Sequence, residues 1–395
     1  MSTPSFNLAD APMAKDRTEG WKYFRSFGDV FEADGTYFLT GAGEVNFAYS
    51  HAEIFSSAKA FESLGSPIPL VPIAIDPPEH VRYRRVLDPM LAPRVINAME
   101  EELRRQIDEI IGFFVDEGSF DGVADVARLY PTQVFLTVAG MPLEDRDQFI
   151  EWSEFIIEHS TAGMDGADPE VLAAAGAVFE YINGFIEKKR VVPGDDILSK
   201  VLQLEGDDKW SDDEIFGMCF LFVLAGLDTV TSGIGFALYH LAKNQELQAQ
   251  LRADYGLIPA FIEEVLRLEP PAPIAPRITL CDVEVGGMTI PSGSMVSIVA
   301  GAANRDERRF PSPDDFSLVT ADRSHFAFGG GIHRCLGSHL AKREIRLDIE
   351  ELLENIGRFT LAPGAEPEIV WPCGTSHLKE VRIDFAPRYQ FLGQR

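Results

Sequence analysis

A long apolar run in the middle of the chain restricts the fold more than any other feature. The run extends from Phe216 to Ala242, and Ser211 and Glu214 before it stand at the spacing of a helical capping box. This pattern predicts one long helix, in a protein core or in a membrane. A core helix is the better prediction, because Asp228 near its centre would cost about 2.5–3.5 kcal/mol in a membrane span.

Composition argues against several classes of function. The chain has 395 residues, of which 46 % are hydrophobic, and its formal charge is −27. Nucleic acid and anionic membranes are poor partners for such a chain, because their phosphates would repel it. Four scattered cysteines without a CxxC pair argue against a closed zinc site and a disulfide framework. The N-terminus shows no apolar signal segment, so we expect a cytoplasmic protein without a membrane anchor.

Periodic patterns divide the chain into helical and strand-rich regions. Val30–Thr40 contains two strand-like runs around Asp34-Gly35, which predicts a hairpin. From Ile96 to Phe114 an apolar residue recurs every three or four positions, which predicts helix. Further helices are expected over 144–158, 169–188, 194–204 and 245–268, and a last one from just after Cys335 to about Ile356.

The fold class predicted from these patterns is mainly α with small β-sheets (α+β). No repeat, linker or low-complexity tract interrupts the chain, so we expect a single domain over residues 1–395. Its helical part is expected mainly over 76–268 and 336–356. Its β-rich part, where proline, glycine and β-branched residues concentrate, is expected mainly over 28–60, 270–300 and 358–395.

The segment with the clearest chemical content is FAFGGGIHRCLGSHLAKRE, from Phe326 to Glu344. Its three consecutive glycines allow a tight loop that can approach a flat or bulky group. Cys335 follows this loop and precedes a predicted helix, whose positive N-terminal end favours the thiolate over the thiol. Positive potential is added nearby by His333, Arg334 and His339. The alternative for an isolated cysteine is a buried structural role beside a glycine turn.

The string Phe-Gly-x-Gly-x-His-x-Cys-x-Gly, from Phe328 to Gly337, resembles the haem-binding signature of the cytochrome P-450 superfamily, the haem-thiolate monooxygenases. The resemblance implies their fold, a large helical region and a smaller β-rich region around a buried haem. It implies haem b as cofactor, with the Cys335 thiolate as axial ligand of the iron. Phe328 would shield the sulfur, and Gly329 and Gly337 would belong to the loop that directs N–H groups towards it.

Two further matches concern the scaffold and the haem carboxylates. EEVLRLEPP holds Glu264 and Arg267 three residues apart, on one helix face, and the resemblance implies a structural ion pair. DPPEHVRYRR resembles the segment that meets the haem propionates, and further propionate partners are implied downstream. The residues concerned are His80, Arg84, Arg277 and His333. Without the resemblance, each of these charges would be interpreted as part of a solvated surface.

AGLDTVT, from Ala225 to Thr231, resembles the superfamily's oxygen-activation motif. Thr229 can donate a hydrogen bond to the carbonyl of Ala225 or Gly226 and loosen the helix, leaving room for dioxygen and water beside these small residues. Asp228 and Thr229 would then act as the catalytic pair that delivers protons. The alternative is an Asp-Thr cap at a helix break. The motif favours an oxygen-driven monooxygenase over the superfamily's peroxide-driven members.

FVLAGLDTV, DPPEH and HLAKREI are most similar to soluble bacterial enzymes of the camphor-hydroxylase type. Those enzymes hold the substrate ketone with a tyrosine before DPPE, but this chain has no tyrosine between Phe61 and His80, so camphor is not expected. In the loop before DPPEH, the apolar residues Ile68, Leu70 and Val71 would form one wall of a pocket. Family position suggests further pocket residues, for which core packing is the alternative: Leu221, Ile274, Ala275, Gly374 and Thr375. Such a pocket suits a compact apolar substrate, such as a monoterpenoid or norisoprenoid.

Electrons are expected from separate proteins, because no fused flavin or iron–sulfur domain is visible. The resemblance implies an iron–sulfur ferredoxin and its flavin reductase, with NAD(P)H as the indirect donor. A basic set in the segments around the cysteine could steer an acidic ferredoxin, or could serve propionates and helix ends. This basic set is Arg82, Arg84, Arg85, Arg94, Arg334, Lys342 and Arg343. A monomer is expected, because no amphipathic stripe is left over.

Three competing functions remain open at the level of sequence. A peroxide-using haem-thiolate enzyme would not need Asp228 and Thr229. A non-catalytic haem sensor or carrier would not need them either, and no output domain is visible. A cysteine hydrolase would pair Cys335 with a histidine base, and the glycine loop would then be a coincidence.

Overall fold

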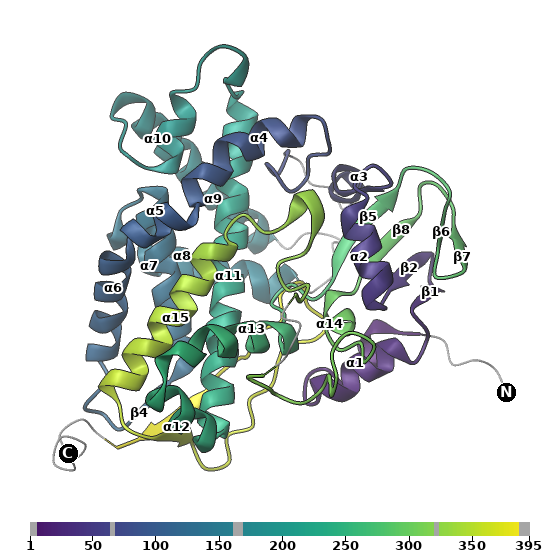
Figure 1. Cartoon of the computed structure of the whole chain (residues 1–395). Coiled ribbons are helices and arrows are strands. Elements are labelled where there is room, and N and C mark those ends of the chain that lie inside the picture. The colour runs from purple at the N-terminus through teal and green to yellow at the C-terminus, as the bar shows by residue number, and fades with distance from the viewer. Residues whose placement is uncertain (1–5, 64–67, 161–168, 320–323, 387–395) are drawn as a thin grey trace.

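The computed structural model describes residues 6–63, 68–160, 169–319 and 324–386. Figure 1 shows a helical part and, beside it, a part built on a β-sheet from the N-terminal segment and the residues before 300. This arrangement agrees with the α+β class expected from the sequence. The helix α11 runs through the helical part and packs against α15.

The larger sheet joins strands from two distant segments of the chain, in the order β1-β2-β8-β5-β3. Only β2 and β8 run parallel; the other neighbours are antiparallel. Its strands are β1 (Val30–Ala33), β2 (Thr36–Leu39), β3 (Phe55–Ser56), β5 (Ala275–Thr279) and β8 (Met295–Ile298). The predicted hairpin is confirmed, because Asp34 and Gly35 both have positive φ between β1 and β2.

Helices and a small hairpin flank this sheet. They are α1 (Arg17–Arg25), α2 (Ala42–Ser50), α3 (Ser57–Ser63), α14 (Ala300–Ala303) and the hairpin β6 (Val283–Val285) with β7 (Met288–Ile290). The region predicted as β-rich over 28–60 therefore contains α2 and most of α3 as well as strands.

The C-terminal strands form a second, separate sheet. They are β9 (Phe359–Leu361) and β10 (Arg382–Phe385), and β10 lies between β9 and β4 (Ser119–Asp121). Because β4 comes from the middle of the helical region, the strands predicted after 358 belong beside the helices and not to the larger sheet. Figure 1 shows them at the foot of the helical part, beside α12.

The helical part follows the predicted helices with two corrections. Its helices are α4 (Glu79–Leu87), α5 (Pro93–Ala98), α6 (Glu100–Gly112), α7 (Leu129–Ala139), α8 (Arg146–Ser160), α9 (Pro169–Val191), α10 (Ile197–Leu202), α11 (Asp212–Lys243), α12 (Gln245–Ala253), α13 (Ile258–Leu268) and α15 (Ser338–Asn355). The 96–114 stripe is divided between α5 and α6. The helix predicted over 245–268 is two helices, because Asp254 accepts from the Gly256 N–H and Pro259 opens α13.

Short helical turns connect these helices. They are η1 (Leu8–Asp10), η2 (Asp88–Leu91), the π-helical η3 (Gly122–Ala127), η4 (Leu143–Asp145), η5 (Gly206–Asp208), η6 (Tyr255–Leu257) and η7 (Gly331–His333).

The capping box at the start of α11 is confirmed. Ser211 Oγ accepts from the Glu214 N–H at 3.3 Å, and a Glu214 carboxylate oxygen accepts from the Ser211 N–H at 2.6 Å. By length and composition α11 is the one helix of the described chain that could cross a membrane, but 56 % of its most apolar window is buried in the fold. It is the core helix that the sequence predicted.

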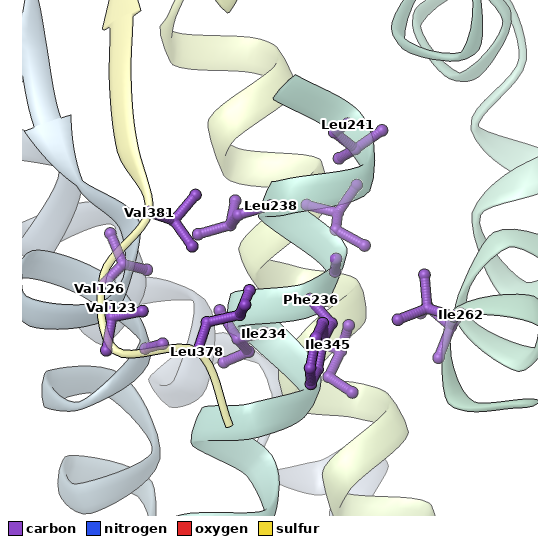
Figure 2. Close-up of a cluster of buried hydrophobic side chains, with 14 of the residues drawn as sticks. Val123, Val126, Ile234, Phe236, Leu238, Leu241, Ile262, Ile345, Leu378 and Val381 are labelled. Atoms are coloured by element: carbon purple, nitrogen blue, oxygen red, sulfur yellow. The ribbon is translucent and has the colours of Figure 1, made fainter. Parts of the chain in front are cut away.

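The C-terminal half of α11 is the centre of the main hydrophobic core (Figure 2). Ile234, Phe236 and Leu238 are fully buried there. Their partners come from η3, α13, α15 and the C-terminal segment, and Figure 2 labels Val123, Val126, Ile262, Ile345, Leu378 and Val381 among them. Burying one such side chain stabilises the fold by about 1.5–3 kcal/mol. The core thus fixes α11 against α15, the two helices that flank the candidate site.

Candidate active site

The loop that carries Cys335 is closed by backbone contacts. The Cys335 N–H donates to the Phe328 carbonyl at 2.9 Å, and the Gly337 N–H donates to the cysteine sulfur. α15 begins at Ser338, as predicted from the sequence. The loop therefore presents the sulfur at the start of a long, well-packed helix.

The glycines before Cys335 allow the loop to pack on α2. Gly329 and Gly331 have φ of +66° and +60°, a conformation that glycine adopts without strain. A Cβ on Gly331 would lie 2.9 Å from the Tyr49 carbonyl carbon and closer still to its oxygen. The Tyr49 ring also packs on Phe326, with centroids 6.2 Å apart. Sequence reasoning did not identify Tyr49, because nothing local to it marks a contact with so distant a loop.

Cys335 lines an internal recess. The residue has accessible surface, yet burial raises the pKa of its thiol. These two facts agree only if the accessible surface lies inside the fold. The Gly337 N–H at the helix start and the charges of Arg84 and Arg334 lower the thiol pKa, as the sequence predicted, but burial outweighs them in the polypeptide alone. A metal cation bound by Cys335 would supply positive charge that stabilises its thiolate.

A cluster of imidazoles and guanidinium groups lies beside the cysteine loop. The His80 and His333 rings are 4.4 Å apart between centroids. Burial, assisted by Arg277, His80 and Arg84, lowers the pKa of His333 to about 3, and burial also lowers the pKa of His80. Both imidazoles are therefore neutral at physiological pH. The Nε2 atoms of both rings are buried and have no hydrogen-bond partner within the described residues.

The two arginines of this cluster are placed differently. Arg277 on β5 is 6 % exposed, and it donates to the Pro276 carbonyl and lies 5.9 Å from the Tyr49 ring centroid. Arg84 on α4 donates to the Arg334 carbonyl at 2.8 Å and pairs with Asp88 at 2.7 Å. The structure thus brings together all four residues that the sequence assigned to the propionates.

Asp76 holds this cluster to the sheet, a role that sequence reasoning missed. Its carboxylate accepts from the N–H groups of Ser57 and Ala58 at 3.0 and 3.2 Å, and also from the Ser56 hydroxyl. The carboxylate therefore caps α3 from a segment about twenty positions away. Since Asp76 precedes α4 by three residues, this contact fixes the start of the helix that carries His80.

The middle of α11 also has accessible surface. The Thr229 hydroxyl donates to the Ala225 carbonyl at 2.9 Å, which confirms the predicted bond. Leu224 is 39 % exposed and Ala225 is also exposed, although α11 lies inside the fold. Asp228 is half-buried beside them. A Cβ on Gly226 would meet the Phe135 ring at 3.2 Å, so glycine at this position lets α11 pack closely on α7.

Glu264 and Arg267 form a buried structural pair. Two hydrogen bonds of 2.8 Å join them, and the side chains are 4 % and 3 % exposed. Arg267 also donates to the carbonyls of Asn304, Pro313 and Asp315. A solvated helix face is thus excluded for this pair. The pair holds the segment that leads into the cysteine loop.

The eight predicted pocket residues do not all have the same surroundings. Val71 has no exposed surface and packs in a hydrophobic cluster with the start of α11, so it is a core residue and lines no recess. Leu70 is 7 % exposed. The other six are half-buried or exposed, as a pocket wall requires: Ile68, Leu221, Ile274, Ala275, Gly374 and Thr375.

Most of the basic set is paired with acidic groups. Arg82 pairs with Glu214, Arg85 with Asp208, Lys342 with Glu263 and Arg343 with Glu100. Within the described residues, no ion pair engages the exposed Arg94 and Arg334. The positive charge left for a partner is therefore smaller than the sequence indicated.

The donor set fits an iron porphyrin. A single cysteine, with no cluster of three His, Cys, Asp or Glu side chains anywhere in the described ranges, does not suit a bare metal ion. It suits a metal held in an organic macrocycle. Two orphaned buried imidazole Nε2 atoms and a buried guanidinium are complementary to carboxylates such as haem propionates.

Comparison with known proteins agrees with this chemistry. The family model described as cytochrome P450 matches residues 168–370. The vitamin D(3) 25-hydroxylase of Pseudonocardia autotrophica is 33 % identical over 328 residues, 82 % of this chain and 79 % of that protein. Cytochrome P450-terp of a Pseudomonas species is 32 % identical over 301 residues, 73 % of this chain and 70 % of that protein.

Solved structures share the whole fold. Cytochrome P450 CYP109Q5 from Chondromyces apiculatus superposes with a TM-score of 0.86 at 26 % identity, covering 97 % of this chain and 99 % of that one. CYP109E1 from Bacillus megaterium, in complex with testosterone, has a TM-score of 0.83 at 29 % identity, covering 92 % and 96 %.

Fold and site together define a haem-thiolate protein. The chain belongs to the cytochrome P450 family. It is accordingly a P450 monooxygenase, an oxidoreductase of a family that uses haem b, dioxygen and NAD(P)H through redox partners.

Proposed function

We propose that this protein hydroxylates a small, largely apolar substrate with electrons from a ferredoxin. The observation that carries the proposal is the Thr229–Ala225 hydrogen bond, beside half-buried Asp228 and exposed Leu224 in the middle of α11. On this proposal the hydroxyl, the carboxylate and the apolar surface would lie together at one side of the recess that holds Cys335.

The cofactor would be held by the two groups of residues described above. Cys335 would ligate the iron, with Phe328, Gly329 and Gly337 shaping the loop around its sulfur. The propionates would be bound by His80, Arg84, Arg277 and His333, because neutral imidazoles and guanidinium groups donate to carboxylates. When bound, haem supplies the activation of dioxygen.

The role of Asp228 and Thr229 would be to move protons. The Thr229 hydroxyl donates to the Ala225 carbonyl, which leaves the lone pairs of Oγ1 free to accept a proton or to orient a water molecule. The Asp228 carboxyl group, half-buried next to it, would exchange protons with solvent and replenish the relay. A positioned relay of this kind typically contributes 10²- to 10⁴-fold in rate.

The substrate would lie against apolar side chains. On this proposal one wall is formed on α11 by Leu221, Leu224 and Ala225. The facing wall would be formed by Ile68, Ile274 and Ala275, together with Gly374 and Thr375 from the C-terminal segment. A compact apolar molecule, such as a monoterpenoid or norisoprenoid, fits walls of this composition. Relatives differ in the molecules they act on or bind. One is named a vitamin D(3) 25-hydroxylase, and CYP109E1 was solved in complex with testosterone.

The redox partner would be an acidic iron–sulfur ferredoxin, itself reduced by a flavin reductase. In a chain with a net charge of −27, the exposed Arg334 in the cysteine loop and the exposed Arg94 on α5, which packs against α15, are local positive charges. Local complementarity of this kind raises the association rate. We further propose that residues 1–395 form one domain, monomeric and cytoplasmic.

The test is spectroscopic and separates cofactor from chemistry. The reduced protein with carbon monoxide should show a strongly red-shifted Soret band that disappears in Cys335→Ser. Thr229→Ala should keep this band, lose most hydroxylation driven by ferredoxin and dioxygen, and retain activity driven by peroxide. A wild-type band typical of a histidine ligand would refute the proposed role of Cys335.

A further inference from the structure

One segment beside the recess lies unusually close to α11. This segment, residues 68–76, is called the strap here. At Gly217 the strap backbone occupies the place of a side chain: a Cβ there would lie 3.0 Å from the Pro69 carbonyl carbon and closer still to the carbonyl oxygen. The Val71 backbone nitrogen lies 3.8 Å from the same point. Only glycine at position 217 allows this approach, because backbone cannot swing aside as a flexible side chain can.

The other end of the strap is tied to α3. The Ser57 hydroxyl donates to the Ile73 carbonyl at 2.6 Å, and Asp76 caps the start of α3. Inside the strap, the Ala74 N–H donates to the Leu70 carbonyl at 2.8 Å, and Val71 is fully buried. A segment held at both ends in this way keeps a fixed distance from α11.

The strap covers the face of α11 that carries the exposed Leu224 further along the helix. Leu221, Leu224 and Asp228 follow Gly217 at intervals of four, three and four residues, which places all four on one helix face. Gly217 is buried under the strap, whereas Leu224 is 39 % exposed. The face is therefore covered at Gly217 and accessible at Leu224, and a closer approach of the strap leaves less of the face accessible.

We propose that Gly217 is a specificity-determining residue, which limits substrate size by letting the strap close on α11. The inference rests on the proposed haem-thiolate monooxygenase. Gly217 would touch neither substrate nor cofactor and would act through the position of the strap. A larger residue at 217 would lift the strap and admit bulkier ligands, at the expense of contacts with compact ones.

The experiment measures dissociation constants of two imidazoles for the haem-loaded protein. 4-Phenylimidazole is the compact probe and a biphenyl-substituted imidazole is the bulky one; nitrogen binding to the iron shifts the Soret band. In Gly217→Ala the ratio of the bulky to the compact dissociation constant should fall about tenfold or more, because one methylene of mismatch in an apolar pocket has an effect of that order. Hydrogen exchange of the Ala74 amide should accelerate in the same variant.

Gly235→Ala is the matched control. It makes the same substitution in the same helix, but its Cβ would meet only the Val123 side chain, at an ordinary 3.7 Å. The control should leave the ratio and the Ala74 exchange rate unchanged. If Gly217→Ala takes up no haem, Ser57→Ala, which loosens the other end of the strap, should lower the ratio in its place.

The outcomes separate this inference from the proposed function. Haem-loaded variants at position 217 or 57 whose ratio equals that of wild type refute the inference and leave the proposed function standing. If the ratio falls equally in Gly235→Ala, the inference is also refuted, because the higher helix propensity of alanine would then explain the effect. A wild-type protein without the thiolate-type carbon monoxide band refutes the proposed function itself.

Discussion

Removal of the Glu264 carboxylate should destabilise the protein strongly. Arg267 is 3 % exposed and receives its only carboxylate partner in the described residues from Glu264, through two hydrogen bonds of 2.8 Å. In Glu264→Ala the guanidinium would remain buried with backbone carbonyls alone. Breaking a buried pair in this way costs about 3–5 kcal/mol. The Ser317 N–H, which donates to Glu264 at 2.9 Å, would lose its acceptor as well.

This loss of stability corresponds to a fall in the melting temperature. Unfolding entropy is about 2.1 cal/mol/K per residue, so a chain of 395 residues has about 0.8 kcal/mol/K. A loss of about 4 kcal/mol should therefore lower the melting temperature by about 5 °C. Scanning calorimetry of the haem-loaded wild type and variant measures it.

An exposed pair of the same residue types at the same spacing provides the control. Glu102 and Arg105 are three residues apart on α6, and their side chains are 41 % and 50 % exposed. Glu102→Ala should barely change the melting temperature, because solvent-exposed ion pairs contribute little. Equal shifts in Glu264→Ala and Glu102→Ala would show that burial is not what makes the first pair matter, and would refute the reasoning.

Three further predictions follow from single contacts. Thr229→Ala should lower dioxygen-driven hydroxylation by about 10² or more while peroxide-driven turnover persists, and parallel losses of both activities would contradict the relay. His325 and Lys342 overcome the effect of burial and lower the pKa of Glu263 from 4.5 to about 2. A carboxyl group with a lowered pKa stabilises the folded state at pH values above its pKa in the unfolded chain. About 3 kcal/mol of the free energy of unfolding should therefore be lost as pH falls from about 5 to 2. Glu263→Gln should flatten that part of the stability–pH curve, and an unchanged slope would refute the assignment. Gly331→Ala, with positive φ and the Tyr49 backbone in the way, should lose most of its haem, measured as the ratio of Soret to protein absorbance; full retention would show that the loop tolerates a side chain.

Local patterns in the sequence predicted much of the fold. The hairpin at Asp34-Gly35, the capping box at Ser211 and the start of α15 after Cys335 are all where the sequence placed them. Each depends on residues within a few positions of one another. The single helix predicted over 245–268 was wrong. An apolar period runs through the turn at Asp254 and Pro259, and it concealed the break between two helices.

Candidate-site residues that belong to a recognised motif were predicted from the sequence. His80 and His333 are 253 positions apart, yet the resemblance assigned both to one cofactor, and their rings meet at 4.4 Å. Its errors concern environment. Val71, assigned to a pocket wall, is fully buried in a hydrophobic cluster, and burial of the Cys335 thiol outweighs the effect of the helix start on its pKa. Burial is a property of the packed whole, so no residue's own neighbours in sequence determine it.

The sequence by itself determined the helices, the caps and the chemical identity of the groups that face the recess, because these depend on side-chain type and short-range spacing. Only the tertiary structure decided how closely those groups are held. Tyr49 against the glycine loop, Asp76 on α3 and the strap on Gly217 are contacts between distant segments. Packing selects them from many combinations that the same local patterns allow.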